Sequence, residues 1–109
     1  MNIPTVIESP YAGDSKRNMA YLYDCMLDSI ARGEAPFASH LIYTQVLNDA
    51  MPDERKLGIE MGYAWATLAR RMAVYIDLGI SFGMAQAIQY ANQTCIQVEF
   101  RCLKGKWES

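Results

Sequence analysis

Short apolar stretches along the chain have the pattern of buried β-strands. They are residues 5–7, the apolar strand within residues 72–79 that ends on Asp77, and residues 96–103, where apolar and polar side chains alternate. A weaker strand opens residues 35–49 and then continues as a polar, aromatic loop. The β-branched and aromatic residues in these stretches suit a pleated, buried surface, so the pattern predicts a sheet of four or five strands.

The segments between these strands have the three- to four-residue periodicity of amphipathic helices. Apolar side chains recur at this spacing over residues 14–32, 52–71 and 80–93, which predicts three main helices. Gly33 follows the first helix as a C-cap. The second helix begins at Pro52, with acidic residues in its first turn and arginines in its last, an order that complements the helix dipole.

Strands and helices therefore alternate along the whole chain. This order is typical of an α/β three-layer sandwich, a Rossmann-like fold in which helices cover both faces of a parallel-dominated sheet. At 109 residues the chain is long enough for one core, so we expect a single domain over residues 1–109, with a frayed tail at 104–109.

Composition and charge exclude several classes of function. The net charge is −2 and the basic residues are scattered, so we expect no nucleic-acid partner. No apolar run approaches the ~20 residues of a membrane span, and no basic leader precedes an apolar block, so we expect a cytoplasmic protein. Three widely spaced cysteines and a single histidine predict reduced thiols, no metal site and no cofactor.

The polar and aromatic clusters follow the predicted strands. In a parallel α/β sheet, ligands bind beyond the carboxyl ends of the strands. Residues 8–14, 39–45 and 77–83 all fall at this edge, which predicts a small-molecule pocket there. The candidate ligand-binding residues are Glu8, Ser9, Pro10, Tyr11, Asp14, Ser39, His40, Tyr43, Asp77, Ser81, Gly83 and Met84.

Several of these residues suit a nucleoside-like ligand. Tyr11 can stack on a base, while Ser9 and the helix N-terminus at Asp14 can bind ribose hydroxyls. The alternative is that these residues simply form a turn. His40 is either a ligand contact or a hydrogen-bonded core residue. Ser81 opens the third predicted helix, where free backbone N–H groups can bind an anion or a hydroxyl group.

Glu8 and Asp77 are candidate catalytic residues because they end strands that we expect to be neighbours. Two carboxylates at one pocket would have raised pKa values and could act as acid, base or nucleophile at a glycosidic bond. The alternative is that each is a structural acid that caps a backbone turn.

The segments "IESPYAGD", "VYIDLGIS" and "SFGMAQAIQYA" resemble the nucleoside 2-deoxyribosyltransferase superfamily. The chain is still more similar to a group of small phage and bacterial domains that share "SPYAGD", "PFASHLIYTQ" and "DLGIS-x-GM". The transferase resemblance implies a Rossmann-like nucleoside site in which the motif glycine falls on Gly83. The glutamate that takes the deoxyribosyl group in that superfamily falls on Ala87, which cannot attack an anomeric carbon.

These observations predict a protein that binds a nucleoside or nucleotide derivative, such as an ADP-ribose-like signal, and sequesters or senses it. The phage resemblance implies a role in host–virus conflict, with the protein then in the host cytoplasm. One alternative is an N-glycosidase or deoxyribosyltransferase that uses Glu8 or Asp77, and another is a structural subunit. We also expect a homo-oligomer in which Met61 and Trp65, from the helix over 53–70, form part of the contact.

Overall fold

The computed structural model describes residues 2–108 of the chain. The strands are β1 (Ile3–Glu8), β2 (Glu34–Phe37), β3 (Arg71–Tyr75) and β4 (Gln97–Arg101). The helices are α1 (Ser15–Ala31), α2 (Ser39–Ile42), α3 (Pro52–Ala66) and α4 (Phe82–Gln93), with two 3-10 turns, η1 (Tyr43–Gln45) and η2 (Gly105–Trp107).

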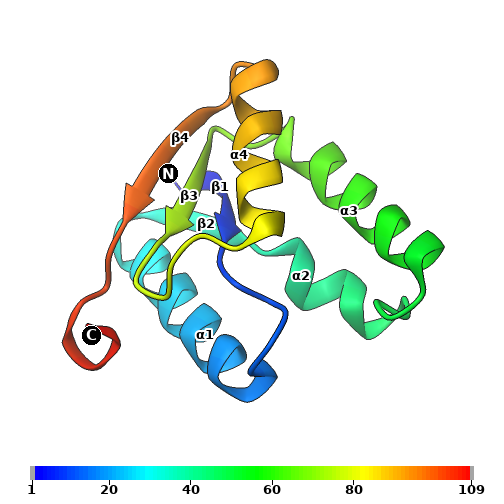
Figure 1. The fold of residues 1–109 in the computed structure, drawn as a ribbon. Coiled ribbons are helices and arrows are strands. Elements are labelled where there is room, and N and C mark those ends of the chain that lie inside the picture. Colours follow the sequence, from blue (N-terminus) through cyan, green and yellow to red (C-terminus); the bar gives the residue numbers. More distant parts are fainter. Residues whose placement is uncertain (1, 109) are drawn as a thin grey trace.

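The four strands form one parallel sheet in the order β2-β1-β3-β4 (Figure 1). Val6 in the central strand β1 pairs with Phe37 on β2 and with Met72 on β3. Helix α1 covers one face of the sheet, and α3 and α4 lie on the other. The predicted α/β architecture with a parallel sheet and helices on both faces is therefore confirmed.

Successive side chains of a strand point to opposite faces of the sheet, which divides the core into two halves. Val6, Met72 and Val74 pack with α4, whereas Ile7 and Tyr75 pack with α1. Glu8 follows the same alternation as Val6 and so lies on the face that α3 and α4 cover. This alternation decides which residues at the strand ends reach the site.

The ends of α1 agree with the prediction. Asp14 is the N-cap, and its carboxylate accepts a hydrogen bond from the backbone N–H of Arg17 at 3.1 Å. Gly33 follows the helix with a φ of +84°, a left-handed conformation that glycine adopts without strain.

The second helix, α3, is shorter than predicted. It ends at Ala66, and the arginines expected in its last turn lie beyond it. The backbone N–H of Arg70 donates to the carbonyl of Pro4 at 2.9 Å, and Arg71 opens β3. Pairing with β1 therefore prevents these residues from continuing the helix.

Two further segments differ from the prediction. Residues 39–45 form α2 and η1, where the sequence predicts a loop. The tail predicted to be frayed is ordered through residue 108: the Trp107 ring lies 5.0 Å from that of Tyr21, and its Nε1 donates to Asp24 at 2.9 Å. Burial of an aromatic ring against α1 explains this order. Ser109 lies outside the described residues.

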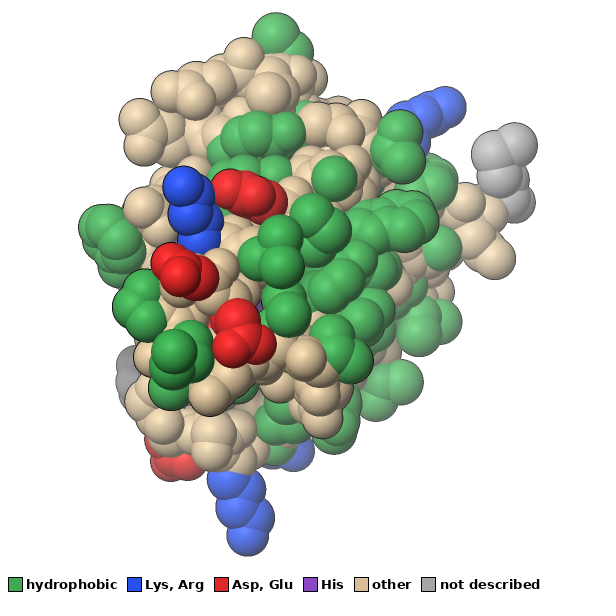
Figure 2. All heavy atoms as spheres, turned by 90° about the vertical axis from the view of Figure 1, so that its right-hand side faces the viewer, with side chains coloured by type: hydrophobic (Ala, Val, Ile, Leu, Met, Phe, Trp, Pro, Cys, Tyr) green, Lys and Arg blue, Asp and Glu red, His purple; other side chains and the backbone are tan. Residues whose placement is uncertain are grey.

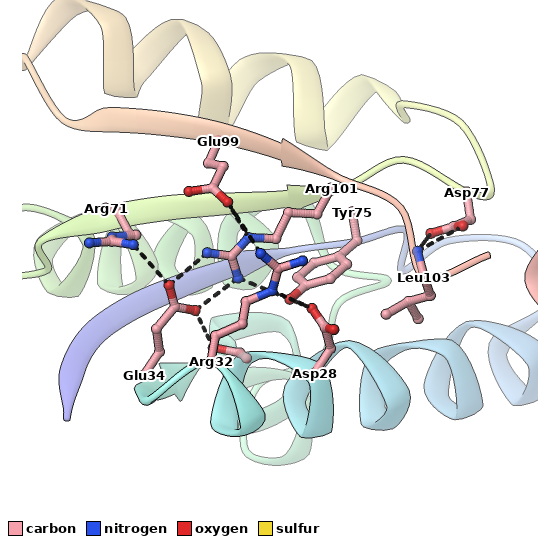
Figure 3. A network of polar contacts seen from close by, with 10 residues as sticks. Asp28, Arg32, Glu34, Arg71, Tyr75, Asp77, Glu99, Arg101 and Leu103 are labelled. Atoms are coloured by element: carbon pink, nitrogen blue, oxygen red, sulfur yellow. Dashed lines mark hydrogen bonds and ion pairs between the residues drawn. The ribbon is translucent and has the colours of Figure 1, made fainter.

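A buried polar network lies between the sheet and α1 (Figure 3). Its centre is the ion pair between Glu34 on β2 and Arg101 on β4, with an Nη2–Oε2 distance of 2.6 Å. Both side chains are almost completely buried. Because β2 and β4 are the two edge strands, the pair links opposite sides of the sheet.

Candidate functional site

A cavity of about 200 Å³ lies at the carboxyl end of β1, between α2, α3 and the N-terminus of α4. Most of the predicted ligand-binding residues line it, and those residues are Glu8, Ser9, Tyr11, Ser39, His40, Tyr43, Ser81, Gly83 and Met84. The structure therefore brings together side chains from three segments that are far apart in the sequence, as the strand-end argument predicts.

The inner end of the cavity is apolar apart from Glu8 and Ser9. Its wall contains the buried side chains of Ala66, Met72 and Ala87. Glu8 is half-buried here, and no other described residue donates a hydrogen bond to its carboxyl group or forms an ion pair with it. Burial disfavours the charged carboxylate and raises the pKa of Glu8 to about 8. Glu8 is thus mostly protonated at neutral pH.

Ser9 and His40 form a hydrogen-bonded pair beside Glu8. The Ser9 Oγ atom lies 2.9 Å from Nε2 of His40, which is brought there by the short helix α2. Burial lowers the pKa of His40 to about 4, so the imidazole is neutral at physiological pH. The pair therefore offers a ligand neutral donors and acceptors and no positive charge.

Tyr11 lies in the turn that joins β1 to α1. Asn18 on α1 holds this turn, because its Nδ2 donates to the carbonyls of Tyr11 and Ala12 at 3.1 and 2.9 Å. The Tyr11 ring meets the His40 ring edge-on, with centroids 6.4 Å apart. A half-buried ring anchored through its own backbone is well placed to stack on a planar ligand.

Helix α4 contributes its first two turns to the cavity. Ser81 caps this helix, and its hydroxyl accepts a hydrogen bond from the backbone N–H of Met84 at 3.2 Å. The exposed ring of Phe82 lies at the rim. Ala87, one turn further along, lines the cavity at the position where the transferase resemblance implies a nucleophilic glutamate.

Helix α3 forms a side of the cavity that the sequence interpretation missed. Gly58, Gly62 and Ala66 line it at four-residue spacing, with Tyr63 between them. A Cβ atom on Gly62 would lie 2.6 Å from Ser39 Oγ, so only glycine lets α2 approach α3 this closely. This repeat of small residues is a sequence signal that could have identified the face of α3 that borders the cavity.

The charged residues of the cavity lie on α3 and in the loop before it. Arg55 forms an ion pair with Asp49, with an Nη1–Oδ2 distance of 3.3 Å. Glu54 accepts a hydrogen bond from the backbone N–H of Asn48 at 3.0 Å. These side chains have partners already, unlike Glu8.

Asp77 does not line the cavity, and the prediction of a raised pKa at this residue is wrong. Burial by itself would raise its pKa, but hydrogen bonds from the Tyr21 hydroxyl and from the backbone N–H groups of Leu103 and Lys104 outweigh burial and lower it. Figure 3 shows Asp77 beside Leu103, where it holds the chain after β4. Asp77 is therefore a structural acid that caps a backbone turn. This is the second of the two roles that the sequence analysis gave for it.

Two other predicted residues also lie outside the cavity lining. Pro10 shapes the turn after β1, and Asp14 uses its exposed carboxylate to cap α1.

Within residues 2–108, no group of three or more His, Cys, Asp or Glu side chains is placed to hold a metal ion. None of the helices that the structure describes is both long and apolar enough to cross a membrane.

The fold and the cavity define a small, parallel α/β domain with a pocket of about 200 Å³ at the carboxyl edge of its sheet. The chain belongs to the family described as Domain of unknown function (DUF7768), whose sequence profile matches residues 4–101. The matched region contains β2, β3, β4, all of β1 except Ile3, and every residue that lines the cavity. No curated protein is similar enough in sequence to count as a relative.

Proposed function

We propose that the cavity binds a nucleoside or nucleotide derivative and holds it without turning it over. The observation that carries this proposal is that Glu8 and Ala87 line the same, mostly apolar cavity. Glu8 is neutral there and has no partner among the described residues. Glu8 supplies polar recognition, the aromatic residue Tyr11 supplies stacking area, and the wall at Ala87 has no nucleophile. The resemblance to deoxyribosyltransferases supports a nucleoside as the ligand class.

The size of the cavity suits part of such a ligand. A volume of about 200 Å³ is below the ~300–1,000 Å³ of typical ligand sites. It therefore encloses one ring system, and the sugar or phosphate of a nucleotide remains nearer the mouth. A more open groove continues from the cavity along α3 and contains Lys56, Glu60 and Arg55, which is paired with Asp49. Lys56 is the basic residue of this groove that has no ion pair among the described residues, and it can meet a phosphate there.

An N-glycosidase is the second candidate, because a carboxyl group with a pKa of about 8 can act as a general acid. Glycoside hydrolysis, however, uses two carboxyl groups that flank the bond. The other two acids of the cavity, Asp49 and Glu54, are engaged by Arg55 and by the backbone of Asn48. This arrangement favours binding over catalysis.

Incubation with nucleosides and nucleotides, followed by heat denaturation and chromatography, separates these functions. We expect the ligand to be recovered intact, which supports sequestration or sensing and, given the resemblance to phage domains, a role in host–virus conflict. Release of free base would instead establish the glycosidase. If none of the compounds binds or shifts the melting temperature, the proposal is wrong and a structural subunit is the better description.

Replacing Tyr11 with alanine tests the stacking role. Loss of one stacking partner is worth about 1–3 kcal/mol, which corresponds to a roughly 5- to 150-fold weaker affinity. The fold should be kept, because Asn18 holds this turn through backbone carbonyls. Calorimetry with the bound nucleoside measures the affinity, and Tyr23→Ala on the exposed side of α1 is the matched control. If affinity falls only in proportion to a loss of thermal stability, Tyr11 has no stacking role.

We also propose that the protein is a homo-oligomer that uses the exposed apolar side of α3. Leu57, Met61 and Trp65 on α3 and Leu68 just after it form this patch, and Trp65 and Leu68 are 50% and 74% exposed. Figure 2, viewed from the side of α3, shows hydrophobic side chains gathered into a continuous band. Patches of this kind often mark protein–protein contacts. Trp65 is already oriented, since its Nε1 donates to the Tyr43 hydroxyl at 2.8 Å.

Light scattering after gel filtration tests this contact. At tens of micromolar we expect at least twice the monomer mass, and Met61→Glu should reduce it to one chain because a buried charge opposes association. Circular dichroism shows whether the variant keeps its fold. A monomeric mass for the parent protein contradicts the proposal.

A further inference from the structure

We infer that Glu8 recognises the edge of a neutral heterocyclic base on which a hydrogen-bond donor and an acceptor are adjacent, as on adenine. Its protonated carboxyl group forms both hydrogen bonds. This inference rests on the proposed function of the cavity and names the chemistry that the ligand must present.

The position of Glu8 leaves its carboxyl group available to a ligand. It is the last residue of β1, opposite Val74 on β3, and its side chain lies on the face covered by α3 and α4. The neighbouring wall residues Met72 and Ala87 have no polar atoms in their side chains that could donate to a carboxyl group. Glu8 is half-buried, and Arg71 Nε is the one side-chain polar atom in the described residues that is both fully buried and unpartnered, so the Glu8 carboxyl group is still reached by water. A ligand that closes the cavity displaces this water, so a ligand edge that supplies both hydrogen-bond partners binds more tightly than one that does not.

The protonation state of Glu8 determines which ligand edge fits. A protonated carboxyl group has one donor and one acceptor, whereas a carboxylate has acceptors only. Adenine presents a ring-nitrogen acceptor beside its exocyclic amino donor and so matches the protonated form. A guanidinium group presents two donors and matches the carboxylate. With a pKa of about 8, Glu8 favours the adenine-like pattern at neutral pH.

Two other groups that line the cavity, His40 and Tyr63, have shifted pKa values. His40 on α2 has a pKa of about 4 and stays neutral above pH 6. Burial raises the pKa of Tyr63 on α3 above its usual value of 10.0, so it stays protonated below pH 9. Helix α4 contributes no acidic or basic side chain to the cavity. The remaining titratable or charged lining residues are Tyr11, Tyr43, Asp49, Glu54 and Arg55, and Asp49 is paired with Arg55.

Calorimetry with adenosine at pH 6.5 and pH 9 tests the inference. Since only the protonated form binds, affinity should fall about 10-fold between these pH values as Glu8 ionises. Glu8→Gln keeps one donor and one acceptor at every pH, so it should bind equally well at both. Glu8→Ala should bind at least about 10-fold more weakly than the parent at pH 6.5. Asp53→Asn, an exposed change at the start of α3, is the control and should behave like the parent.

Purine riboside, which lacks the exocyclic amino group of adenosine, provides the second probe. We expect it to bind about 10-fold more weakly at pH 6.5, through loss of one hydrogen bond to Glu8. Equal affinity for the two nucleosides, or a Glu8→Gln variant as pH-dependent as the parent, overturns the inference and leaves the proposed function standing. If no nucleoside or nucleotide binds at either pH, the proposed function fails and this inference fails with it.

Discussion

Replacing Glu8 with glutamine will stabilise the ligand-free protein at alkaline pH. The folded-state pKa of Glu8 is about 8, against 4.5 for an unperturbed glutamate. Because the folded pKa is raised, the stability linked to this group is fully present below pH 4.5 and is lost as the pH rises to 8 and above. One pKa unit corresponds to about 1.4 kcal/mol, and water at the cavity mouth reduces the effect, so we expect a loss of about 2–4 kcal/mol.

Urea unfolding at pH 5, 7 and 9 measures this difference. The parent should lose stability across the series relative to Glu8→Gln, which has no charge to bury. Asp53→Asn should follow the parent, because its carboxyl group is exposed. Parallel curves for the parent and Glu8→Gln would mean that solvent stabilises the Glu8 carboxylate in the folded protein, so its pKa would not be raised.

The sequence predicts the edge of the sheet that carries the cavity, but it does not predict which acid enters it. Glu8 ends β1 and Asp77 follows β3, and these two strands are neighbours in the sheet. Their side chains differ because residues alternate between faces: Tyr75, like Asp77, lies on the α1 side, whereas Val6, like Glu8, lies on the other. Strand β3 is buried on both faces, so its apolar pattern gives no sign of this alternation.

Other parts of the site depend on tertiary contacts that no local pattern reveals. The spacing of Gly58 and Gly62 marks a face of α3, but it does not reveal that Ser39 on α2 approaches Gly62 closely enough to exclude a Cβ atom there. The residues around Trp107 have the composition of a disordered tail. Trp107 nevertheless donates a hydrogen bond to Asp24 on α1, which is distant in the sequence. Local propensity fixes the elements well here, whereas contacts between distant segments fix the lining of the cavity and the order of the tail.

Removing one partner of the buried Glu34–Arg101 pair will have the largest destabilising effect that we predict. The guanidinium of Arg101 donates to both carboxylate oxygens of Glu34, at 2.8 and 2.6 Å, and both side chains are at most 2% exposed. Arg101→Met leaves the Glu34 carboxylate buried without its main partner, and breaking such a pair typically costs about 3–5 kcal/mol. Chemical denaturation at pH 7 measures this loss. Arg32→Met is the matched control, since the ion pairs of Arg32 with Asp28 and Glu99 are partly exposed and each worth less than about 1 kcal/mol.

The double variant Glu34→Met/Arg101→Met shows whether the loss arises from the uncompensated charge. Replacing both members of a buried pair with apolar side chains is often nearly neutral, so we expect a stability within about 2 kcal/mol of the parent. The hydrogen bond from Arg101 holds the pKa of Glu34 below its usual value, despite burial. This stabilisation is present above pH 4.5 and is lost in acid, so the parent should weaken more than the double variant as the pH falls. If the double variant is as unstable as Arg101→Met, the network stabilises the fold through its geometry, and an unpaired charge is not the cause of the loss.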